Sequence, residues 1–334
     1  MTQAPKVTAR PKTYPAPEFP PRKPKLFART PPAIFPALLG LQGLALALRR
    51  GMEVLGIEQG PIEALIGALL VVVAFALLAL AVKIAHRPAV VLQDLAVLPG
   101  RAGYATASMG VMASAALVAP YAPVLAWGIL LAGLALHGLL AVTMVVVLAR
   151  GPAETRGVTP VWHLNFVGFI VGGVAALALG QIDLAQGLLL ATMPVAALIW
   201  GLSLAQLIGR IPPAPLRPLL AIHLAPAALF VVVAQGVGQP LLALTFAGVG
   251  AVILTSLLVF ARWITASGFS PLWGAFTFPI SAAASAALTL GETWQWAGMI
   301  LLAASLGVVP LIAWQVLKLW PGNRLALKTN AAEA

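Results

Sequence analysis

Long stretches without a single Asp, Glu, Lys or Arg dominate the hydrophobic pattern of this chain. They cover residues 64–82, 102–149, 157–182, 184–209, 218–261, 263–291 and 293–317. A membrane-spanning helix needs about 20 apolar residues. Two of the stretches are long enough for two helices each, with turn signals at residues 120–123 and 236–240. The pattern therefore predicts ten transmembrane helices, over residues 31–48, 61–83, 90–118, 123–148, 159–180, 184–208, 217–236, 239–262, 271–290 and 294–318.

Composition points to the same class of protein. The 334 residues are 61% hydrophobic and 9% charged, whereas soluble domains carry about 25% charged residues. A surface this apolar must be covered by lipid, so we expect an all-α polytopic membrane protein. The absence of cysteine excludes disulfides, thiolate metal sites and cysteine nucleophiles.

The basic residues predict how the chain is oriented in the membrane. With the N-terminus inside, eighteen of the 20 Lys and Arg residues fall on the inner side, and Arg49 and Arg50 alone fall outside. Lys and Arg collect in cytoplasmic loops, so both termini are predicted to be cytoplasmic in a bacterial inner membrane. This placement explains the net charge of +11 without nucleic acid as a partner.

The same reasoning divides the chain into three parts. Residues 1–30 are basic and rich in proline, a composition typical of disordered segments. They are predicted to form a disordered cytoplasmic tail. Residues 31–320 form the transmembrane domain, and residues 321–334 are expected to be a short cytoplasmic tail.

A short pattern that ends in proline or phenylalanine recurs near the start of every odd-numbered predicted helix. Its end positions are residues 36, 99, 166, 226 and 279, so the spacings are 63, 67, 60 and 53 residues. One helical hairpin fits each interval. The five copies read Ala33-Ile34-Phe35-Pro36, Ala96-Val97-Leu98-Pro99, His163-Leu164-Asn165-Phe166, His223-Leu224-Ala225-Pro226 and Phe276-Thr277-Phe278-Pro279.

The odd-numbered helices also hold more of the Gly, Ser, Thr, Asn and His, while the even-numbered ones are bulky and apolar. Proline within a helix bends it, and such defects at membrane depth occur where they are buried or line water. Small residues also mark tight helix packing, which explains any one segment equally well. The fivefold recurrence favours five hairpins around a central pore, with the odd helices inside.

Three segments carry a resemblance to a known family. Residues 272–282 (LWGAFTFPISA), 224–227 (LAPA) and 35–41 (FPALLGL) resemble the tellurite-resistance/dicarboxylate transporter family, which includes a bacterial tellurite-resistance channel homologue and the plant slow anion channels. The resemblance covers about residues 30–320. It implies a pore within five hairpins, usually in a trimer, plugged by a ninth-helix phenylalanine that falls on Phe278. Two features depart from it: Asn165-Phe166 replaces a proline kink, and Arg101 has no counterpart.

Phe278 is the candidate gate, because a phenyl ring in a narrow apolar constriction blocks ions by excluding water. The alternative is a packed core aromatic. Phe35 and Phe166 occupy related repeat positions and would form further layers. The complete set of candidate pore-lining residues is Phe35, Pro36, Pro99, Arg101, Asn165, Phe166, His223, Pro226, Thr277, Pro279 and Ser281.

Two polar candidates have alternative interpretations. Arg101 lies inside the membrane on an inner helix, where it would attract anions and repel cations, or it lies at the cytoplasmic interface where that helix begins. Asp94 can pair with Arg101 only if the helix bends. His223 and His163 either titrate near neutral pH or are hydrogen-bonded interfacial residues.

The function that fits best is an anion channel or uniporter for small anions such as chloride, nitrate, dicarboxylate or tellurite-like oxyanions. Proton-coupled carriers commonly need a membrane carboxylate, and the charge-free stretches hold none. A metabolite exporter or other secondary transporter, or a non-conducting subunit of a membrane complex, stays open. An enzyme is not expected, because its clustered His and carboxylates are lacking. No cofactor or metal is expected, and a homotrimer is.

Overall fold

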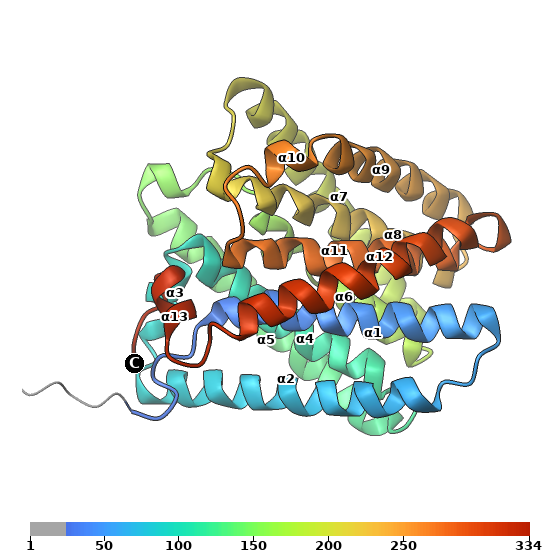
Figure 1. The fold of residues 1–334 in the computed structure, drawn as a ribbon, viewed down its shortest axis with the longest axis horizontal. Helices are drawn as coiled ribbons and strands as arrows, with labels where there is room; N and C mark the ends of the chain where they lie inside the picture. The colour runs from blue at the N-terminus through green and yellow to red at the C-terminus, as the bar shows by residue number, and fades with distance from the viewer. Residues whose placement is uncertain (1–24) are drawn as a thin grey trace, which may run out of the picture.

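The computed structural model describes residues 25–334, except the side chain of Glu154. Within these residues all regular secondary structure is helical, as predicted. Eight of the helices are long and apolar enough to cross a membrane. The main helices run alongside one another along the long axis of the molecule (Figure 1).

Five inner helices form the centre of the bundle. Each contacts the next in a closed circuit, in which the last also contacts the first. An outer helix separates each inner helix from the next one in the chain, so the circuit assembles segments from the whole sequence. In chain order the inner helices are α1 (Phe35–Leu55), α4 (Leu98–Val118), α6 (Ile170–Ala178), α8 (Leu224–Gly236) and α11 (Gly274–Thr289).

Five outer helices pack against the inner ones, each on the inner helix that precedes it in the chain. They are α2 (Gly60–His86), α5 (Pro123–Arg150), α7 (Ile182–Gly209), α9 (Pro240–Val259) and α12 (Glu292–Leu317). In the most apolar stretch of the α1 span 72% of the residues are buried, against 6% in α9. The outer helices therefore present their large side chains to the surroundings, as lipid contact requires.

The inner helices begin irregularly. Short 3₁₀ or π segments precede four of them: η1 (Pro32–Ile34), η3 (His163–Val167), η4 (Ala214–His223) and η5 (Pro271–Trp273). Of these η3 is a π-helical turn. It lies where Asn165-Phe166 replaces proline, so a change of helix type produces the irregularity there.

The sequence predicted one helix over residues 90–118, but the structure has two, α3 and α4. The first, α3, covers Val90–Leu95, and Val97 is extended. The reason is Pro99, because its ring clashes with the carbonyl four residues earlier and it has no N–H to donate. That carbonyl belongs to Leu95, the last residue of α3, and it accepts a 2.8 Å hydrogen bond from Nε of Arg101 instead.

The sequence predicted that the repeat prolines bend the inner helices from within, but most of them lie in the first turn of a helix. Pro36 and Pro99 are the second residues of α1 and α4, and Pro226 is the third residue of α8. Proline is well tolerated in the first turn, where its missing N–H would be unpaired. Only Pro279 of the set lies inside its α-helix. The prolines therefore mark where most of the inner helices begin.

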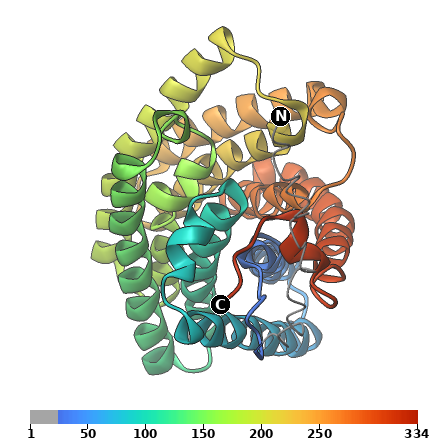
Figure 2. The ribbon, with the colours of Figure 1, turned by 90° about the vertical axis from the view of Figure 1, so that its left-hand side faces the viewer.

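Both described ends of the chain lie at one end of the bundle, here called the basic end, where α2 finishes with Lys83 and His86. Residues 1–24 of the predicted disordered tail lie outside the described residues. Ala28 and Thr30 are buried, and the Thr30 carbonyl accepts a 3.0 Å hydrogen bond from Lys83. Residues 321–334 fold back as a turn and α13 (Arg324–Lys328). Figure 2 faces this end.

Candidate functional site

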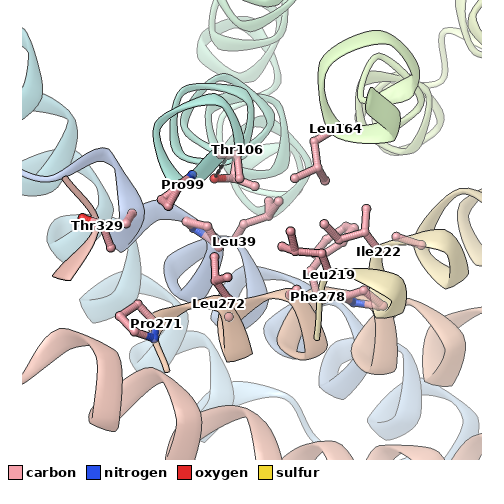
Figure 3. A pocket seen from close by; sticks show the side chains of 17 residues that line it. Leu39, Pro99, Thr106, Leu164, Leu219, Ile222, Pro271, Leu272, Phe278 and Thr329 are labelled. Atoms are coloured by element: carbon pink, nitrogen blue, oxygen red, sulfur yellow. Dashed lines mark hydrogen bonds between the residues drawn. The ribbon is translucent and has the colours of Figure 1, made fainter. Parts of the chain in front are cut away.

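A narrow cavity of about 40 Å³ lies inside the inner circuit. Every hairpin contributes to its wall, as Figure 3 shows for Leu39, Thr106, Leu164, Ile222 and Phe278. One water needs about 10–15 Å³ of such volume, so the cavity has room for about three. It is too small for a hydrated ion.

The cavity wall is apolar. Among the described residues that line it, Thr106 and Thr329 alone carry polar side chains, and none is charged. Thr106 Oγ1 donates to the Ala102 carbonyl at 2.7 Å, and Thr329 Oγ1 to the Leu325 carbonyl at 2.7 Å. Both hydroxyl protons are thus used within their own helices. A narrow apolar space without free donors excludes water and ions.

Phe278 occupies the point where α11 approaches α1. Its side chain is 6% exposed and lines the cavity. A Cβ added to Gly43 would lie 2.8 Å from Cδ2 of Phe278 and 3.1 Å from Cε2. The ring therefore lies directly against the α1 backbone, and the missing side chain at Gly43 makes the space for it.

Thr277, the residue before Phe278, fixes the position of α11. Thr277 Oγ1 lies 3.1 Å from the Pro36 carbonyl oxygen and 2.7 Å from that of Gly274. A Cβ at Gly40 would be 2.1 Å from this Oγ1. The two glycines of α1, three residues apart, thus receive consecutive residues of α11, a close approach of the kind that small residues permit between membrane helices. The sequence interpretation did not single out Gly40 and Gly43, although residues three apart lie on one face of a helix.

The structure brings the candidate gate Phe278 to the cavity, together with three of the candidate pore-lining residues, Pro36, Pro99 and Pro279. The buried Phe35, Thr277, Ser281 and Pro226 are not among the lining residues. Asn165 is also buried, and its Nδ2 donates to the Val161 carbonyl at 2.9 Å.

Phe166 and His223 also lie outside the lining. The Phe166 ring packs edge-on against Trp162, and His223 Nδ1 is 2.9 Å from Nε2 of His163. Their neighbours Leu164 and Ile222 line the cavity instead. The displacement follows from the helix type, because 3₁₀ and π turns rotate side chains by different angles from an α-helix. The sequence pattern alone did not show these turns.

Arg101 lies in the first turn of α4 and is buried, but it is not among the cavity-lining residues. The α4 positions that face the cavity are Pro99, Ala102 and Thr106, one helical stripe. Besides Leu95, the Arg101 guanidinium reaches the Thr155 carbonyl at 3.3 Å. In this position Arg101 satisfies carbonyls at the C-terminal end of α3.

Asp94 pairs with Lys83 and not with Arg101. Lys83 Nζ lies 2.7 Å from Asp94 Oδ2, and both side chains are fully buried. The Tyr104 hydroxyl donates to the same oxygen at 3.2 Å. The ion pair ties α2 to α3 at the basic end.

Comparison with known proteins supports the resemblance seen in the helix motifs. No curated protein matches the chain. The model of the SLAC1 family, described as voltage-dependent anion channel, matches residues 29–319. The match spans all ten inner and outer helices, from before the start of α1 to just beyond the end of α12. The chain therefore belongs to the voltage-dependent anion channel family.

Proposed function

We propose that the protein passes small anions through its inner circuit and that Phe278 closes the path. The observation that carries this proposal is the cavity itself, which is lined by all five hairpins and reaches the Phe278 ring. Displacement of the Phe278 ring would widen a path that one segment of every hairpin lines. The small apolar cavity is what a closed state of such a path requires.

Ten membrane crossings complete the proposed layout. The eight long apolar helices are joined by Leu98–Val118 and by the shorter His163–Ala178. Sixteen residues span about 24 Å, less than the ~30 Å of a hydrocarbon core, and the chain on either side supplies the rest. The distribution of Lys and Arg supports cytoplasmic termini in a bacterial inner membrane. Resemblance to the family supports a homotrimer.

Electrostatics favour anions over cations. No carboxylate of residues 25–334 is found among the side chains that the structure places at the cavity, and the chain as a whole carries a net charge of +11. Excess positive charge raises the local concentration of anions near an entrance. The proposed substrates are chloride, nitrate and small oxyanions or dicarboxylates. A role in tellurite resistance would follow from such anion traffic.

The test is anion flux in liposomes for the native chain and for Phe278→Ala. We expect low flux from the native chain and a large anion-selective flux from the variant, because truncation removes the ring that fills the path. Phe246→Ala is the matched control. It removes a buried ring that packs between Phe230 and Trp200 and lies outside the cavity lining. A folded Phe278→Ala protein as silent as the native chain would refute the proposal.

A further inference from the structure

The last described residues fold back over the basic end of the bundle. After α12, Gly322 and Asn323 both take left-handed backbone conformations, with φ of 80° and 62°. This reversal directs α13 and the residues beyond it across the helix ends instead of away from them. α13 and the C-terminus lie on the face of the bundle turned toward the viewer in Figure 2.

This segment reaches the candidate conduction path. Thr329 is 4% exposed and is one of the residues that line the cavity. It faces the same space as Pro99 and Pro271, from the side opposite Leu164 and Ile222 (Figure 3). Leu325 of α13 is fully buried. A residue about fifty positions beyond the last motif thus forms part of the wall at the basic end.

The residues after Thr329 form hydrogen bonds and an ion pair with residues at the basic end of the bundle. The Ala332 N–H donates to Oδ1 of Asp94 at 2.7 Å, and the Ala334 N–H donates to the Ala28 carbonyl at 3.0 Å. Glu333 pairs with Arg29 at 2.7 Å. Its carbonyl also accepts from Arg87.

We propose that residues 324–334 are an autoinhibitory lid that covers the basic end of the conduction path. The proposal rests on the proposed function, because it assigns the lid to that path. The segment follows the chain reversal at residues 322–323 and contains a single short helix. The side chains of its Arg29–Glu333 pair are 41% and 46% exposed, and exposed pairs contribute little to stability. These features suit a part that detaches without unfolding the bundle.

Thiol accessibility tests the lid without any need for conduction. The chain has no cysteine, so Ala102→Cys, at a cavity-lining position, creates a single reporter. We expect a membrane-impermeant thiol reagent to modify it severalfold faster once residues 324–334 are deleted. Glu53→Cys, exposed at the far end of α1, is the control and should react equally with and without the segment. Equal rates at residue 102 would overturn the proposal.

A second variant keeps the chain at full length, in case the deletion disturbs folding. Glu333→Arg replaces attraction to Arg29 with repulsion and should also speed modification at residue 102. Combining it with Arg29→Glu restores an opposite-charge pair and should return the slow rate. If neither Glu333→Arg nor the double variant changes the modification rate at residue 102, the Arg29–Glu333 pair has no role in covering the path.

Flux separates this proposal from the proposed function. In the Phe278→Ala background, deletion of residues 324–334 should raise anion flux severalfold, because both obstructions are then absent. A conducting Phe278→Ala protein whose flux ignores the deletion overturns the lid alone. A folded Phe278→Ala protein that stays silent refutes the proposed function, while the reaction rate at residue 102 still decides whether the segment covers the cavity.

Discussion

Helices α1 and α2 are adjacent in the chain and in space, yet they differ in how much of their surface is buried by protein. In α1, eleven of 21 residues are buried, and its glycines receive the side chains of α11. In α2, six of 27 residues are buried, and a Cβ added to Gly67 would meet nothing within 4 Å. The neighbours of an inner helix are fixed protein atoms, whereas lipid adjusts to whatever shape an outer helix offers.

The difference explains why the same residue type has unequal importance in the two layers. Interiors are close-packed and tolerate little added volume. On the lipid side an added or removed methyl group is accommodated by mobile chains. Inner positions should therefore respond strongly to changes of size, and outer positions weakly.

The largest effect is expected from Gly40→Val, compared with Gly67→Val. Overpacking typically costs about 1–3 kcal/mol and occasionally more. A Cβ 2.1 Å from Thr277 Oγ1 belongs to the severe cases, because it also breaks the α1–α11 hydrogen bond. We expect little folded protein from Gly40→Val on size-exclusion chromatography. Gly67→Val should fold normally, since valine is a better helix former than glycine. Similar yields and melting temperatures would contradict the distinction between the layers.

A smaller effect is expected from truncating leucine in the two layers. Leu38 is 1% exposed in α1, and Leu139 is 65% exposed in α5. Leu38→Ala should lose about 2–5 kcal/mol of stability, because a cavity is left behind. Leu139→Ala should stay within about 0.5 kcal/mol of the native chain. Thermal unfolding in detergent, followed by tryptophan fluorescence, measures both, and a large loss at residue 139 would indicate a protein contact there.

Among the inner-helix substitutions the smallest effect on stability, about 1 kcal/mol, is expected from Gly43→Ala, which extends the comparison to function. The new Cβ meets only the Phe278 ring within 3.1 Å, and that ring can turn away. Anion flux should rise severalfold as the ring is displaced. In the Phe278→Ala background the same substitution should change nothing, since neighbouring residues couple only while both are present. An equal rise in both backgrounds would show that Gly43 acts independently of Phe278.

Sequence reasoning predicted the outer helices well. The predicted ranges 61–83 and 123–148 compare with Gly60–His86 and Pro123–Arg150 in the structure. Bilayer thickness fixes the length of such helices, and charged residues or proline mark their ends. The break before α4 was missed, because it depends on how Pro99 meets the carbonyl of Leu95.

The candidate site was predicted less completely, for reasons that lie in three dimensions. Phe278 and three prolines lie at the cavity, but Leu164 and Ile222 line it in place of the predicted Phe166 and His223, because π and 3₁₀ turns precede these inner helices. The alternatives for Arg101 depended on where its helix begins, and the break that starts α4 at Leu98 was not predicted. Thr329 gave no signal in the sequence, since its role depends on a reversal at residues 322–323.

The closure of the inner circuit within a single chain has a consequence for stoichiometry. Because α11 returns to contact α1, no second copy is needed to complete the wall around the cavity. Under the proposed function, an assembly of several chains would be a set of parallel conductors, one per chain, whose currents add. Mixing native and Phe278→Ala chains should then give a conductance that grows in proportion to the variant fraction, with no dominance of one chain over its neighbours.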